Sequence, residues 1–338
     1  MLSAFAFDAA PGAQAIECAT DYESPEAAYE SGREAQRGGD SLSAICAHEF
    51  AASKGIFLAK FYLAEILSDT NNIYGDPTRA FDLYSEIIRS NRDVDPHYDY
   101  RAQFVARSYV MISRYLSGDL IAGGVKRSDR QARRLLGYAA TYFDDANAQY
   151  GFARMLLDGR GGVRNVRSGK HYLSSLSRQG HAGAQGYLAE LFWIGKHVER
   201  RHDYALALST MAVRNAPRED RIWIGELHHE ISCSADANVQ AKARKLITRW
   251  TARYRTKRIY PKARNDVFSG GSIEWSCAED GSAEEPGAKD GEDHGALGTV
   301  AASDRPDGGT SHAERDRLRA MHGTMFGFGK TEATIPAN

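Results

Sequence analysis

Three stretches of nine residues repeat one pattern: AKFYLAEIL at 59–67, AQYGFARML at 148–156 and AQGYLAELF at 184–192. Each begins with Ala, and a large apolar residue, a second Ala and another large apolar residue follow four, five and eight positions later. On an α-helix these offsets lie on one arc. The pattern therefore predicts helices whose alanines let a neighbouring helix approach closely.

A second half of the unit repeats at a fixed distance from the first. Small residues, Ala80, Gly169 and Ala205, stand 21 residues after each leading Ala, and Ala148 and Ala184 are 36 residues apart. Helix-turn-helix units of this length stack into an α-solenoid. We expect an all-α solenoid rather than an irregular helical bundle. The predicted repeat-core residues are Ala59, Ala64, Ala80, Ala148, Ala153, Gly180, Ala184, Ala189 and Ala205.

Turn and capping residues place the boundaries of the repeats. Gly55, Asp144 and Gly180, four residues before each leading Ala, tolerate the left-handed backbone that ends a preceding helix. Helix starts are expected at Asp76, Ser128, Asn165 and Pro217. We predict an N-terminal segment at 1–23, a solenoid at 24–257 with an atypical first pair, four repeats at 56–215 and a closing pair, and a tail at 258–338.

Composition excludes several classes of protein. A net charge of -1 argues against a whole-protein preference for polyanions, and no apolar run reaches the roughly 18 residues that span a bilayer. Four cysteines without a C-x-x-C pair exclude a zinc ribbon and a thioredoxin-type site, but leave the redox compartment open. Ala4-Phe5-Ala6 fits a signal-peptidase box without its usual preceding region. Either this is chance, or residues 1–23 hold the remnant of a signal peptide and the true start lies upstream.

No motif predicts catalysis, a cofactor or a metal site. His228-His229-Glu230 lacks the i, i+4 histidine spacing of a zincin, and we expect it on a polar helix face. The glycine-rich 159–162 lies between helices, without the strand that precedes a phosphate-binding loop.

The basic segment 244–264 has two interpretations. Its aromatic residues could accompany Lys and Arg in binding nucleic acid or an anionic membrane. Alternatively, Leu246, Ile247, Trp250 and Tyr254 cap the open end of the solenoid while the charges face water, which we favour because every solenoid needs a cap. The basic patch comprises Arg244, Arg249, Arg253, Lys257 and Arg258.

From about residue 265 the chain is rich in Gly, Ser and acidic residues, and we expect it to be mostly disordered. A flexible link lets its acidic part meet the basic segment.

The period, the Ala-x-x-x-Leu-Ala core and the link at 158–163 resemble the Sel-one-like repeats, which are protein-binding relatives of the tetratricopeptide repeat. Within that family, the order of 79–87, 125–133, 148–157 and 180–184 is similar to the ExoR-type regulators of rhizobial exopolysaccharide production. The resemblance covers roughly residues 50 to 245, and the region beyond 257 departs from it.

The resemblance implies a non-enzymatic periplasmic repressor, without a small-molecule substrate, that binds an ExoS-like membrane sensor kinase and holds a two-component pathway inactive. Tyr62 and Tyr187 share one repeat position at the margin of the buried arc, and we assign them to a binding surface or to packing at the edge of the core. The alternative function is a cytoplasmic adaptor or nucleic-acid-associated protein that uses residues 244–264.

Overall fold

The computed structural model describes residues 18, 22–91, 93–217 and 220–254, and within them the regular structure is α-helical, as predicted. In chain order the first helices are α1 (Pro25–Gly38), α2 (Ser41–Ser53), α3 (Phe57–Ser68), α4 (Pro77–Ser90), α5 (Ala102–Ser117) and α6 (Asp129–Tyr142). They are followed by α7 (Ala146–Asp158), α8 (Val166–Arg178), α9 (Ala182–Ile194), α10 (His202–Asn215), α11 (Arg221–Cys233) and α12 (Ala237–Arg253).

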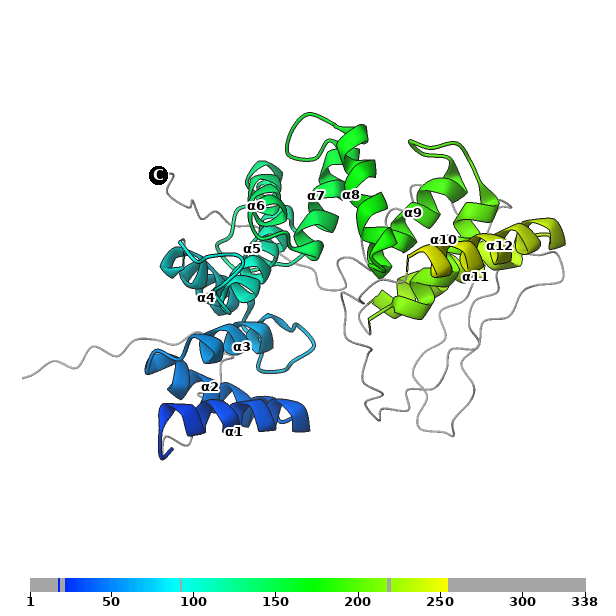
Figure 1. Ribbon diagram of the computed structural model, residues 1–338. Coiled ribbons are helices and arrows are strands. Elements are labelled where there is room, and N and C mark those ends of the chain that lie inside the picture. The colour runs from blue at the N-terminus through cyan, green and yellow to red at the C-terminus, as the bar shows by residue number, and fades with distance from the viewer. Residues whose placement is uncertain (1–17, 19–21, 92, 218–219, 255–338) are drawn as a thin grey trace, which may run out of the picture. The chain divides into compact units, whose positions relative to one another are not determined.

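The helices form two compact units that divide between Arg127 and Ser128, in the link between α5 and α6. In the first unit, each helix from α1 to α5 packs against the next one along the chain. In the second unit, α6 to α10 stack in the same order, and α10 also packs against both α11 and α12 (Figure 1). Each unit is thus a stack of helices in which most contacts join neighbours along the chain, as in a solenoid.

The turn residues adopt the backbone that the sequence predicts. Gly55, Asp144 and Gly180 have φ angles of 94°, 53° and 86°. The side chains of Asp76, Ser128 and Asn165 accept hydrogen bonds from backbone amides of the first turn of α4, α6 and α8.

The α-helix expected from Pro217 begins later, at Arg221, and Asp220 before it is in a 3₁₀ turn. Pro217 instead opens a turn, in which the Asp220 N–H donates to the Pro217 carbonyl at 3.1 Å.

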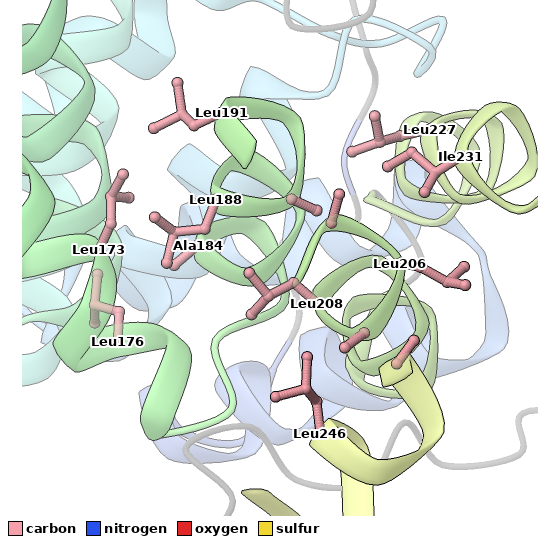
Figure 2. Close-up of a cluster of buried hydrophobic side chains, with 14 of the residues drawn as sticks. Leu173, Leu176, Ala184, Leu188, Leu191, Leu206, Leu208, Leu227, Ile231 and Leu246 are labelled. Atoms are coloured by element: carbon pink, nitrogen blue, oxygen red, sulfur yellow. The ribbon is translucent and has the colours of Figure 1, made fainter. Parts of the chain in front are cut away.

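The predicted alanines form the contacts between helices. All eight of them are fully buried, whereas Gly180 lies half-buried in a turn and is not part of the core. In the second unit, Leu173 and Leu176 of α8 point toward Ala184 and Leu188 of α9 (Figure 2). Small and large side chains therefore alternate across this interface, which permits close packing.

Helix α12 closes the second unit as the cap interpretation predicts. Leu246 is buried in the main core cluster, and Ile247 and Trp250 pack against that cluster. The Trp250 ring meets Tyr204 at a centroid distance of 5.4 Å. The charged side chains of Arg244, Arg249 and Arg253 are exposed. Lys257 and Arg258, like the tail and Ala4-Phe5-Ala6, lie outside the described residues.

Each of the described cysteines forms a disulfide, whereas the sequence alone did not decide whether disulfides form. Cys18 is bonded to Cys46, with 5.1 Å between their Cα atoms, and this bond ties the chain before α1 to α2. Cys233, at the end of α11, is also disulfide-bonded, and its partner lies outside the described residues. Across the part of the chain that the structure describes, no helix has the length and apolar content needed to cross a membrane.

Candidate partner-binding surface

The segment between α4 and α5 is an ordered loop rather than a loose connection. Val94 is buried, and the buried Asn91 donates from Nδ2 to the Ile87 carbonyl at 2.8 Å. Arg101 donates from Nη1 to the Asn91 side chain at 3.0 Å, which links the end of the loop to its beginning. We call residues 93–101 the tyrosine loop.

Carboxylates inside the tyrosine loop fix its backbone. Asp95 accepts hydrogen bonds from the backbone amides of His97 and Tyr98 at 2.8 and 3.0 Å. Asp99 accepts from the Arg101 guanidinium at 2.6 Å, and this side-chain hydrogen bond holds the pKa of the Asp99 carboxyl below its usual value. These bonds organise the loop before any partner binds, which reduces the entropy that binding would cost.

The tyrosine loop holds two aromatic side chains in the solvent. Tyr98 is 91% exposed and Tyr100 is 62% exposed. The Tyr100 ring meets Phe57 edge-on, with centroids 6.3 Å apart. Together with the start of α3, the loop lines a cleft of about 690 Å³ that is bounded by residues 55–58 on one side and by Asp95 and 98–101 on the other. Exposed tyrosines on a rigid frame beside a cleft are typical of protein-binding surfaces.

The predicted binding residue Tyr62 lies beside the buried core of the first unit. It is half-buried, and the guanidinium carbon of Arg33 stands 3.8 Å from the centre of its ring. The His48 ring stacks on Tyr62 and is tilted against Tyr29, with a centroid distance of 5.9 Å in both cases, and His48 is fully buried. Burial lowers the pKa of His48 to about 4. Tyr62 thus belongs to an aromatic cluster covered by an arginine.

Tyr187 has the same type of neighbour in the second unit. The guanidinium carbon of Arg154 lies 5.6 Å from the Tyr187 ring centre and 5.7 Å from that of Tyr150. Burial raises the pKa of the Tyr187 hydroxyl. Tyr62 and Tyr187 are thus both half-buried and both contact an arginine. These contacts suit a binding surface as well as packing at the edge of the core, so both assignments stay predictions.

Sequence reasoning missed the tyrosine loop as a candidate site. The sequence feature that could have revealed it is the pair Tyr98 and Tyr100, which stand in a polar segment between predicted helices. An aromatic side chain in such a segment has no core to enter and is available for binding.

His228-His229-Glu230 lies on a helix, α11, as expected, but it does not form a polar face that is open to solvent. His229 is buried, and His228 Nδ1 lies 3.0 Å from the Ser209 hydroxyl of α10. Glu230 accepts a hydrogen bond from the Trp193 indole at 3.0 Å. Because α11 packs against α9 and α10, its polar residues serve the interface between helices.

His181 caps the N-terminus of α9 and makes the stability of the second unit depend on pH. Its Nδ1 accepts a hydrogen bond from the Ala184 amide at 3.2 Å, and burial lowers its pKa to about 4. In the unfolded chain a histidine binds a proton below about pH 6.5. Folding then excludes that proton, so stability falls as the pH drops from about 6.5 to 4.

We expect His181→Asn, which keeps an N-cap acceptor, to remove this contribution. Between pH 7 and 4 the free energy of unfolding of the wild type should fall by about 3 kcal/mol more than that of the variant. Urea unfolding followed by tryptophan fluorescence at several pH values measures the difference. Equal slopes against pH for the two proteins would contradict the assignment.

Comparison with known proteins identifies the relatives of this fold. The chain is 32% identical over 207 residues to the exopolysaccharide production negative regulator of Rhizobium meliloti (strain 1021). The aligned region covers 61% of this chain and 74% of that protein. The chain belongs to this family of regulators. A second member, from Rhizobium leguminosarum bv. viciae, is 29% identical over 203 residues, 60% of this chain and 73% of its own length.

Structural comparison relates the fold of this chain to that of a solved structure. A protective antigen of uropathogenic Escherichia coli with an SLR fold superposes with a TM-score of 0.51 at 18% identity. The match covers 74% of this chain and 51% of the antigen, so the chain spans about half of that protein. No family model matches the chain. The chain thus has the all-α solenoid of Sel-one-like repeats, as the sequence predicts.

Proposed function

We propose that this chain is a non-enzymatic scaffold that restrains exopolysaccharide production by binding a protein partner. The observation that carries the proposal is the 32% identity that extends over 74% of the Rhizobium meliloti regulator. A stack of helix pairs offers extended surfaces for binding rather than an enclosed cavity for chemistry.

The partner in this proposal is the periplasmic domain of a membrane sensor kinase of a two-component system, and it binds at the tyrosine loop. Tyr98 and Tyr100 supply large, rigid contact areas, and the cleft beside them accepts a protruding side chain. Asp95 lines this cleft, which favours a cationic side chain at its mouth.

A periplasmic location is part of the same proposal, and the disulfides support it. Cys18–Cys46 and the bonded Cys233 are typical of proteins in an oxidising compartment, because cytosolic reductants keep thiols reduced. The same bonds disfavour the cytoplasmic alternative. Fractionation of cells that express the full gene tests the location.

The test of partner binding is capture from solubilised membranes of the source cells, with the full chain as bait and mass spectrometry as readout. We expect the wild type to recover a sensor kinase and the double variant Tyr98→Ala/Tyr100→Ala to recover at least about ten-fold less, since hot-spot side chains contribute about 2 kcal/mol each. In cells that lack the gene, the wild type should lower exopolysaccharide secretion and the double variant should not.

A matched control is Tyr138→Ala, which removes an exposed tyrosine of α6 in the other unit. It should capture the kinase as the wild type does. If the wild type recovers no sensor kinase, the proposed partner is wrong. If the double variant and Tyr138→Ala capture equal amounts, the kinase binds elsewhere.

A further inference from the structure

Helix α12 presents a basic face at the end of the second unit. Its 17 residues contain five Lys and Arg side chains and no acidic residue, and all five are exposed. None of the five forms an ion pair with another residue in the described ranges. A concentration of one charge without neutralising neighbours attracts an anionic group. The basic face consists of Lys242, Arg244, Lys245, Arg249 and Arg253.

A groove runs beside this face, between the end of α10 and the second half of α12. Its volume is about 550 Å³. Arg214 and Arg244 supply two cations, and the half-buried Ile247 supplies apolar surface that continues into the core. An occupant therefore needs carboxylates together with apolar side chains. The lining residues are Arg214, Arg244, Ile247, Thr248, Thr251 and Ala252.

The disulfide of Cys233 indicates which segment lies nearby. Four cysteines occur in the chain, Cys18 is bonded to Cys46, and Cys233 is bonded to a residue beyond the described ranges. Cys277 is the remaining cysteine of the sequence. We propose that Cys277 is the partner of Cys233 and that residues 272–285 occupy the groove and the basic face of α12.

The composition of residues 272–285, SIEWSCAEDGSAEE, matches what the groove requires. The segment has five acidic residues and no Lys or Arg, and Ile273 and Trp275 stand just before Cys277. The carboxylates pair with the basic face, and the two apolar side chains suit the surface at Ile247. Individual exposed ion pairs contribute only about 0 to 1 kcal/mol, so the covalent bond is what keeps the segment in place.

The length of the intervening chain agrees with this path. Helix α12 is 17 residues long, or about 25 Å, and Cys233 precedes its first residue by four positions. From Tyr254 to Cys277 the chain advances 277 − 254 = 23 residues, which as a flexible coil spans about 25 Å. The segment therefore returns along α12 to Cys233 without being stretched.

Formation of this disulfide is an ordinary thiol exchange. The two thiols of Cys233 and Cys277 lose two protons and two electrons, and a disulfide of an oxidising protein accepts them and is reduced to a dithiol. Such proteins belong to the compartments in which structural disulfides form.

The first test is peptide mapping of the full chain, purified without reductant from an oxidising compartment. We expect one cross-linked pair of tryptic peptides that contains Cys233 and Cys277, and its disappearance after reduction. Free thiols at these positions, or a disulfide-linked dimer of the chain, would overturn the proposed pairing.

The second test asks whether the segment covers the basic face. The variant Glu279→Gln/Asp280→Asn/Glu284→Gln/Glu285→Gln removes four charges from the segment. The matched control Asp304→Asn/Asp307→Asn/Glu314→Gln/Asp316→Asn removes the same number farther along the tail. Binding of a heparin fragment at about 50 mM salt serves as the probe, since the affinity of a polyanion depends strongly on exposed Lys and Arg at low salt.

We expect the segment variant and Cys277→Ser to bind heparin about ten-fold more tightly than the wild type, and the control to bind as the wild type does apart from its small change in net charge. High salt should abolish the difference. Equal affinities for the segment variant and the control would show that the basic face is open to an external anion, and would overturn the proposal. Circular dichroism checks whether Cys277→Ser keeps its helical signal. If that signal is lost, the segment variant, which keeps both cysteines, decides the result.

Discussion

Replacing Gly161 by Ala should destabilise the second unit by about 2–5 kcal/mol. Gly161 lies in the link between α7 and α8 with a φ angle of 69°, where an L-residue costs about 1–2 kcal/mol. A Cβ atom there would also stand 2.1 Å from the backbone carbonyl oxygen of Asp129, at the start of α6. Because backbone atoms cannot rotate away, the link or the helix must shift, which adds about 1–3 kcal/mol.

Gly180→Ala is the matched control for this prediction. Gly180 has a φ angle of 86°, but the nearest atom to its added Cβ is a side-chain nitrogen at 3.7 Å. The free energy of unfolding of Gly180→Ala should therefore fall only by the cost of a left-handed backbone at an L-residue, about 1–2 kcal/mol. Urea unfolding followed by tryptophan fluorescence reports on this unit, because the tryptophans of the chain all follow residue 192. Equal losses in the two variants would show that the contact with Asp129 has no energetic weight.

The second large effect is expected for Leu191→Ala, in the core cluster of Figure 2. Leu191 is 1% exposed and lies on α9 among the leucines of α8 and α10. Truncation removes buried apolar surface and leaves a cavity, so the free energy of unfolding should fall by about 2–5 kcal/mol.

The exposed Val163, in the link after α7, provides the comparison. It is 86% exposed, and Val163→Ala should change stability by less than about 0.5 kcal/mol. Thermal and urea unfolding of both variants give the two numbers. A loss below about 1 kcal/mol for Leu191→Ala would mean that the helices around it can close the cavity, contrary to the close packing of this interface.

Local patterns in the sequence were enough to predict the helix pairs and their packing faces. The eight repeated alanines are fully buried, and Gly55, Asp144 and Gly180 have left-handed backbones, because both properties depend on residues a few positions apart. The cap formed by α12 followed from the same reasoning, since its apolar residues lie on one arc of a helix. A solenoid is especially open to such prediction, because each helix contacts mainly its neighbours along the chain.

The tertiary structure alone decided features that depend on contacts between distant residues. The burial of His229 was hidden because α11 packs against two earlier helices rather than standing at the surface. The Cys18–Cys46 bond joins residues 28 positions apart, and no periodicity of the sequence specifies such a pairing. The tyrosine loop owes its form to hydrogen bonds from Asn91 and Arg101, so that Tyr98 and Tyr100 became a candidate site only once that loop was folded. Helical periodicity reports which face of a segment is buried, whereas the partner of a side chain on that face depends on how the segments assemble.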